Sequence, residues 1–161
     1  MEQSGSTDKP QVLIELSPRA LAQVALLGAG LGLLYWLLTL LLKQVIFVPL
    51  FCGDPANVMC VGATGSAGVV SLVLTSVAGL LGLVRLAIYR PLLVALAAAV
   101  SLWGLAAWTA PMFWLETAAW SAALFAASYA LFTWLVRPRS FPFALVLVIV
   151  AVVLIRIVSV L

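Results

Sequence analysis

The chain has 161 residues, of which 66% are hydrophobic and 8% are charged, and its formal net charge is +3. A soluble domain carries about 25% charged residues, so this chain lacks the polar side chains needed to cover a surface in water. The composition predicts an all-α, polytopic membrane protein of one domain and excludes a second soluble module. Because the basic residues are scattered rather than clustered, no nucleic-acid partner is expected.

The sequence offers few side chains for catalysis or metal binding. It has no histidine, the residue most used as a general base, and it has only five carboxylates and two cysteines. Two cysteines cannot complete a four-ligand zinc site. We therefore expect no metal, no cofactor and no catalytic residue, and the sequence favours a protein without enzymatic activity.

Residues 1–16 are expected to form a cytoplasmic polar tail and a short interfacial segment, and residues 17–161 to form a single transmembrane helical domain. Within that domain, five apolar segments are long enough, or nearly so, to cross a hydrocarbon core of about 30 Å as helices. Pro18 and Pro91 stand where a first helical position needs no backbone N–H. The segments are expected at about residues 18–42, 67–84, 91–110, 117–136 and 141–161.

The lysines and arginines between these segments predict an orientation. With the N-terminus in the cytoplasm, the cytoplasmic side holds Lys9, Arg19, Arg85, Arg90, Arg137 and Arg139. The opposite side then holds only Lys43 and Arg156. Since cytoplasmic loops carry an excess of Lys and Arg, we expect a bacterial inner (plasma) membrane protein with its N-terminus in the cytoplasm and its C-terminus outside.

The stretch "LFCGDPANVMCVGATGSAG" contains both cysteines and is expected on the extracytoplasmic side. That compartment is oxidising, so Cys52 and Cys60 are expected to form a disulfide that closes an external loop. The alternative is a thiol–disulfide oxidoreductase, which would lack the usual second cysteine pair. A phosphate-binding loop is excluded because Gly68 is followed by Val-Val rather than Lys-Ser/Thr. The glycines instead favour a tight bend into the second helix or the close approach of another helix.

Small residues recur at four-residue spacing inside three of the segments. Such spacing lets helix backbones approach closely in lipid, where no hydrophobic effect drives association. The pattern favours packing within the chain over packing against a second copy. The residues expected at these contacts are Gly28, Gly32, Ala78, Gly82, Ala118, Ala122 and Ala126.

Arg156 lies inside the last apolar segment, where a charge is costly. It either extends its guanidinium to the lipid headgroups or pairs with Glu116, which is expected on the same side. Four tryptophans surround the preceding external turn, as in an interfacial aromatic belt. A lipid or quinone headgroup site is the alternative there. These tryptophans are Trp103, Trp108, Trp114 and Trp120.

Three classes of function remain. The sequence favours an accessory, assembly or scaffold component whose partners are the lipid bilayer and other membrane proteins or further copies of itself. The alternatives are a thiol–disulfide oxidoreductase using Cys52 and Cys60, and a small transporter or channel acting as an oligomer. Transport paths usually contain ionisable residues within the membrane or interrupted helices, and the expected segments are nearly free of charge.

Overall fold

The computed structural model describes residues 18–52, 58–138 and 140–160, and the side chains of 58–61 and 158–160 fall outside that description. The described residues form helices joined by turns, and they contain no strand. The chain is therefore all-helical over these residues, as the sequence predicts. In order, the elements are α1 (Pro18–Leu42), the π-helical turn η1 (Lys43–Phe47), α2 (Val48–Phe51), α3 (Val58–Arg85), α4 (Pro91–Ser101), α5 (Leu105–Thr109), α6 (Trp114–Leu135) and α7 (Phe141–Val160).

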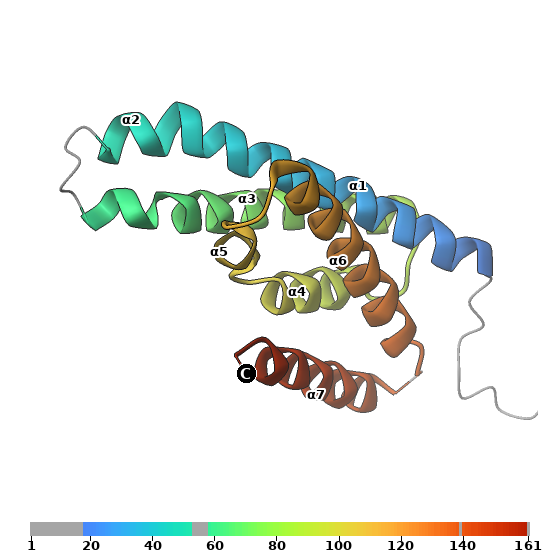
Figure 1. Ribbon diagram of the computed structural model, residues 1–161. Coiled ribbons are helices and arrows are strands. Elements are labelled where there is room, and N and C mark those ends of the chain that lie inside the picture. Colours follow the sequence, from blue (N-terminus) through green and yellow to red (C-terminus); the bar gives the residue numbers. More distant parts are fainter. Residues whose placement is uncertain (1–17, 53–57, 139, 161) are drawn as a thin grey trace, which may run out of the picture.

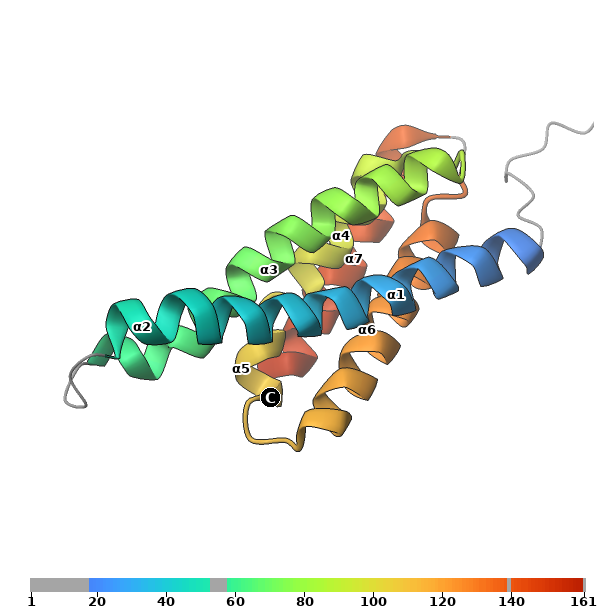
Figure 2. The ribbon, with the colours of Figure 1, turned by 90° about the horizontal axis from the view of Figure 1, so that it is seen from above.

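Successive long helices run in opposite directions across the molecule (Figure 1). α1 and α3 lie antiparallel, α6 crosses α1, and α4 lies between α3 and α7 (Figures 1 and 2). The most extensive contact in the molecule joins α1 to α6, followed by that of α1 with α3. The starts of α1, α4 and α7 and the ends of α3 and α6 lie toward one end of the molecule, at the right of Figure 1.

Three helical segments among the described residues are long and apolar enough to cross a membrane. They are Pro18–Phe51 with 34 residues, Gly62–Arg85 with 24 and Trp114–Leu135 with 22. Two shorter apolar helices, Pro91–Ser101 and Phe141–Ile157, accompany them. Large apolar side chains are exposed along all of these segments. This combination fits a membrane-embedded helical protein.

The first long segment continues from α1 through η1 into α2 without a break. In η1 the Val48 N–H donates to the Lys43 carbonyl, one residue farther than an α-helical bond reaches. Pro49 supplies a reason, because it has no N–H to donate to the carbonyl four residues earlier. The π-helical turn shifts the backbone hydrogen bonds by one residue where the Pro49 bond is missing, and the helix continues beyond it.

The expectation of one unbroken helix over 91–110 is wrong. α4 ends at Ser101, a turn follows, and α5 begins at Leu105 in a new direction. Gly104 has a φ of 93°, a left-handed conformation that glycine adopts without a steric penalty. The glycine inside the apolar run therefore ends one helix and starts another.

The second helix also begins earlier than expected, at Val58 rather than near residue 67. The glycines at 62, 65 and 68 lie inside α3, so they do not form a bend at its entry. A Cβ placed on Gly68 would meet the Ala106 side chain and stand 3.2 Å from the Tyr35 hydroxyl. Gly68 thus permits close approach to α1 and α5, which was the other role expected of these glycines.

The turn between α3 and α4 satisfies the last carbonyls of α3. The Ala87 N–H donates to the Val84 carbonyl at 3.0 Å, and the Ile88 N–H donates to the Leu83 carbonyl at 3.1 Å. This is the hydrogen-bond pattern of a Schellman C-cap. Glycine usually occupies its left-handed position, but here Ala87 does so with a φ of 52°.

Aromatic side chains from α1 and α6 fill the centre of the bundle. The rings of Tyr35 and Phe125 lie 5.3 Å apart, and the rings of Phe125 and Tyr129 lie 6.4 Å apart. Phe132 continues the row and is fully buried. Each such ring contributes a large buried apolar area, and the Tyr35–Phe125 contact joins α1 directly to α6.

Candidate functional site

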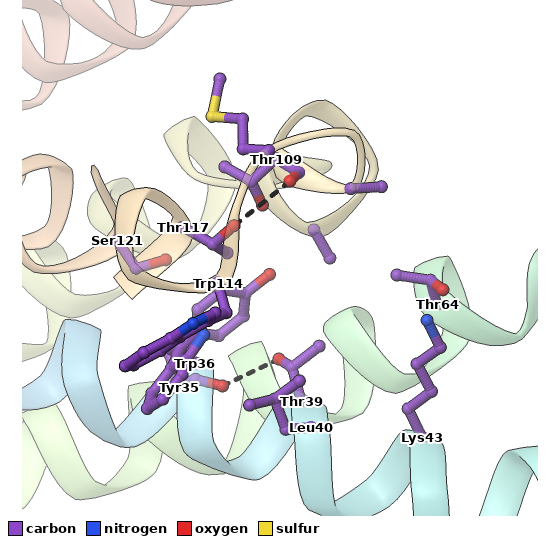
Figure 3. A pocket seen from close by; sticks show the side chains of 13 residues that line it. Tyr35, Trp36, Thr39, Leu40, Lys43, Thr64, Thr109, Trp114, Thr117 and Ser121 are labelled. Carbon is purple, nitrogen blue, oxygen red and sulfur yellow. Dashed lines mark hydrogen bonds between the residues drawn. The ribbon is translucent and has the colours of Figure 1, made fainter. Parts of the chain in front are cut away.

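A cavity of about 180 Å³ lies where α1, η1, α3, α5 and α6 meet (Figure 3). Its walls combine hydroxyl groups, two indole rings and one ammonium group. The polar and aromatic lining residues are Tyr35, Trp36, Thr39, Lys43, Thr64, Thr109, Trp114, Thr117 and Ser121. Leu40, Ala106, Ala110 and Met112 complete the lining.

Three of the threonine hydroxyls donate to backbone carbonyls. The Thr39 hydroxyl donates to the Tyr35 carbonyl at 2.8 Å, and the Thr109 hydroxyl donates to the Leu105 carbonyl at 2.9 Å. The Thr117 hydroxyl lies 3.1 Å from the Phe113 carbonyl and 3.3 Å from the Thr109 carbonyl, linking α6 to the end of α5 (Figure 3). A hydroxyl has one donor and two acceptor lone pairs. Donation to the backbone leaves each of these oxygens its acceptor capacity.

Ser121 differs from these threonines. It is fully buried, and its Oγ has no hydrogen-bond partner within the part of the chain that the structure describes. Two serines on α3 show the usual arrangement in a helix: Ser71 donates to the Ala67 carbonyl at 2.8 Å and Ser76 to the Leu72 carbonyl at 2.7 Å. A buried hydroxyl without a partner costs about 1–3 kcal/mol. Its oxygen is directed toward the cavity side of α6 (Figure 3).

The cavity has an aromatic wall and a charged end. The indole rings of Trp36 and Trp114 stack with centroids 6.2 Å apart and an interplanar angle of 28°. Among the described lining residues, Lys43 is the one that carries a charge. Its side chain extends from η1 toward Thr64 (Figure 3). Trp114 is exposed, so the wall borders the outer surface of the molecule.

A second cavity of about 190 Å³ adjoins the helix break between α4 and α5. Trp103, Gly104 and Ala107 line it from the break, and Gly65, Gly68, Val69 and Leu72 line it from α3. Tyr35 and Ala106 line both cavities. Their side chains therefore stand between the two spaces.

The small residues expected at helix contacts on α1 lie against the backbone of α6. A Cβ on Gly28 would stand 2.8 Å from the Ala126 Cα, and a Cβ on Gly32 would stand 2.6 Å from the Ala122 Cα and meet the Ser121 carbonyl. Carbon atoms in ordinary contact lie about 3.5–4.0 Å apart. Only glycine fits at these two positions with the helices this close.

The other expected contact residues have separate surroundings. A Cβ on Gly82 would stand 2.7 Å from a methyl group of Leu27 on α1. Ala78 is half-buried against the core, and Ala118 is buried in the first turns of α6. The close contacts of these helices thus involve α1 with both α3 and α6, within this chain.

Arg156 makes a hydrogen bond within the chain that the sequence did not indicate. Its guanidinium Nη1 donates to the Trp103 carbonyl at 2.7 Å, in the turn between α4 and α5. The described contacts do not join it to Glu116, which lies exposed in the first turn of α6. The helix break leaves a carbonyl without an intrahelical donor, and α7 supplies that donor from 53 residues away.

The disulfide stays a prediction. Cys52 follows the last residue of α2 and is half-buried, while the backbone at Cys60 belongs to the first turn of α3. The Cys60 side chain and residues 53–57 lie outside the described residues. α2 and the start of α3 contact each other, so the two cysteines stand at the ends of neighbouring helices.

No pattern in the sequence predicts this cavity. Of its lining residues, Trp114 stands out there as part of the tryptophan cluster and Lys43 as one of the two basic residues expected outside. No spacing in the chain links either of them to Ser121. Among the described residues, no three His, Cys, Asp or Glu side chains lie close enough to hold a metal ion.

Comparison with known protein families, curated proteins and solved structures gave no match.

Proposed function

We propose that the chain is a non-enzymatic multi-pass membrane protein that serves as an accessory, assembly or scaffold component of a larger membrane complex. The observation that carries this proposal is the contact between α1 and α6. Gly28 and Gly32 allow the backbones of α1 and α6 to approach closely, and the rings of Tyr35 and Phe125 pack against each other in the same interface. Backbone contact of this kind resists relative movement of the helices, which suits a protein that holds a fixed shape for partners.

We further propose five membrane crossings with the N-terminus in the cytoplasm of a bacterial cell. In this arrangement α4 and α5 together make the third crossing and α7 makes the fifth. Arg19 follows the start of α1, and Arg85, Arg90 and Arg137 lie at helix ends that gather at the same end of the bundle. This clustering supports a cytoplasmic assignment for that end. The hairpin between α2 and α3, with Cys52, would then lie outside.

The test is isolation of the protein, tagged at its C-terminus, from native membranes in a mild detergent. We expect a companion membrane protein at a fixed stoichiometry. Gly32→Ala should lose the companion, because the added methyl group forces α1 away from α6. Gly30→Ala is the matched control, since a Cβ there has nothing within 4 Å. Recovery of the wild-type protein alone, as a monomer or a homo-oligomer, would contradict the proposal.

A small transporter or channel is the second candidate, and the broken third segment favours it. Interrupted helices often line binding sites in transporters, and non-helical backbone at membrane depth is tolerated where it borders a cavity or is buried in protein. Here two cavities meet at Tyr35 beside the break. Proteoliposomes carrying Tyr35→Ala should pass small neutral solutes such as glycerol faster than wild-type ones. Equal flux through both, at the level of protein-free liposomes, would remove this candidate.

A further inference from the structure

We propose that Arg156 is the docking point for a different membrane protein, whose transmembrane helix lies along α7 and carries an aspartate or glutamate opposite the guanidinium. This inference rests on the proposed accessory role and on the proposed fifth crossing by α7, and it names the chemistry of the partner. Three features carry it: the depth of the Arg156 charge, the lack of a counter-charge among the described residues, and the side chains that accompany Arg156 on α7.

On the proposed topology, Arg156 lies inside the membrane. The Arg90 guanidinium stacks on the Phe141 ring, 5.1 Å from its centroid, so α4 and α7 begin at the same level of the bundle. At 1.5 Å per residue, the helix from Phe141 to Arg156 is roughly 22 Å long. Because the hydrocarbon core is about 30 Å thick, the Cα of Arg156 stands within it.

The guanidinium of Arg156 turns toward the middle of the membrane and not toward the outer headgroups. It donates to the Trp103 carbonyl at 2.7 Å. At 1.5 Å per residue, no more than roughly 18 Å separates Pro91 from Trp103, so this carbonyl lies roughly 10 Å short of the outer boundary of the core. Arginines near helix ends usually extend to the interface instead. The charge is therefore held at a depth that lipid phosphates do not occupy.

No carboxylate among the described residues compensates this charge. The hydrogen-bonded partner of the guanidinium there is the uncharged Trp103 carbonyl, which takes up one N–H donor and leaves the net charge and the other donors. Charged side chains inside a membrane are costly, and they mark functional sites that have a partner. Arg156 lines neither of the two cavities described above, so neither space brings a dissolved anion to it. A carboxylate on a neighbouring helix is the counter-charge that suits this position.

The side chains beside Arg156 suit a helix as the partner. Ile149, Val153 and Arg156 follow one another at spacings of four and three residues, so they lie along one strip of α7. This is the spacing along which two helices pack side by side. Ile149 and Val153 are half exposed, and their β-branched side chains have little rotamer freedom to lose on packing. Lipid can cover these two side chains, whereas Arg156 selects a carboxylate, with which a guanidinium forms paired, charge-assisted hydrogen bonds.

A second copy of this chain does not supply that carboxylate. Three of the five acidic side chains precede α1, one lies between α2 and α3, and one stands in the first turn of α6. None lies deeper than the first turn of a membrane-crossing helix, so none reaches the depth of the Arg156 guanidinium. The partner is therefore a different protein. The acidic residues are Glu2, Asp8, Glu15, Asp54 and Glu116.

The test measures binding of synthetic transmembrane helices to the purified full-length protein in phosphatidylcholine vesicles, by energy transfer between labelled protein and labelled peptide. Each peptide is a polyleucine helix with lysines at both ends. One peptide carries a single aspartate at its centre, the second carries asparagine there, and the third carries its aspartate beside the terminal lysines. The peptide with the central aspartate should bind about tenfold more tightly than either of the others.

Variants of Arg156 assign this preference to the guanidinium. Arg156→Gln should abolish it, because the aspartate loses its counter-charge, and Arg156→Lys should keep part of it. Arg85→Gln is the control, because Arg85 ends α3 at the other end of the bundle, and it should leave the preference at about tenfold. Each result is a ratio between two peptides on the same protein, so a general loss of stability does not imitate it.

The docking role is overturned if the wild type binds the asparagine peptide as tightly as the central-aspartate peptide, or if Arg156→Gln keeps the preference. Equal or tighter binding of the peptide with the terminal aspartate would show that Arg156 acts at the headgroup level as an interfacial anchor. Energy transfer between two labelled copies of the protein that disappears in Arg156→Gln would show self-association instead. Because the peptides replace the native partner, this result is separate from the isolation experiment, in which absence of a companion contradicts the accessory role.

Discussion

Gly32→Ala is expected to destabilise the protein more than alanine at either of the other two glycines of α1, Gly28 and Gly30. The new Cβ would stand 2.6 Å from the Ala122 Cα and meet the Ser121 carbonyl. Both atoms belong to the backbone of α6, so no side-chain rotation relieves the clash. Ordinary carbon contacts are about 3.5–4.0 Å, and the two helices would have to separate by about 1 Å at their crossing.

The magnitude follows from that separation. A gap of 0.5–1 Å forfeits about a quarter to a half of the dispersion energy of each contact that opens, and overpacking of a closely packed interior costs about 1–3 kcal/mol. Gly30→Ala is the reference, because its Cβ has open space and alanine gains about 1 kcal/mol over glycine in helix propensity. The two variants should therefore differ by about 2–4 kcal/mol.

Thermal melting in a mild detergent, followed by circular dichroism, measures this difference. On the scaling of soluble domains of similar size it corresponds to roughly 5–15 °C. Gly32→Ala should melt below the wild type and Gly30→Ala at or slightly above it. If the two variants melt together, backbone contact between α1 and α6 does not hold the bundle.

Three further predictions concern the turn, the helix break and the cysteines. Ala87→Gly should raise the stability of the protein by about 1 kcal/mol, because it removes the strain of an alanine in the left-handed conformation. Ala119→Gly, at an exposed position inside α6, should lower the stability by a similar amount. Melting temperatures that shift in the same direction for both variants would contradict this prediction. Arg156→Gln should lower the melting temperature by several degrees and increase proteolysis at the α4–α5 turn, because the Trp103 carbonyl loses its hydrogen-bond donor. Unchanged cleavage at this turn would count against the Arg156–Trp103 hydrogen bond. Without reductant, Cys52 and Cys60 should resist a maleimide–polyethylene glycol reagent in denatured protein, and both should react after reduction; labelling before reduction would exclude the disulfide.

Local signals in the sequence indicated much of the helical pattern. Pro18 and Pro91 stand at the first residues of α1 and α4, because proline at a first helical position costs no hydrogen bond. The break at Gly104 was missed because one glycine in an apolar run is compatible with a continuous membrane helix. What stabilises the break, the Arg156 guanidinium, lies 53 residues away, beyond the reach of any local pattern.

The candidate site was harder to predict for a similar reason. Its lining comes from five elements, and the most informative residue, Ser121, resembles any other helical serine in the sequence. Only its position opposite Gly32 and its lack of a partner within the described structure distinguish it. Spacing within one helix predicts which faces are small, but it does not say which hydroxyl will face a cavity.

The central claim, five crossings with a cytoplasmic N-terminus, is tested most directly at the two ends of α6. Single cysteines would be introduced by Glu116→Cys and Ser140→Cys, both at exposed positions, in a chain whose native cysteines are replaced by serine. A membrane-impermeant maleimide added to intact spheroplasts should label the cysteine at 116 at once and the cysteine at 140 only after lysis. The reverse pattern would contradict the account, because it requires either the opposite orientation or an arrangement in which α4–α5 and α7 do not cross and only the three long helices span the membrane.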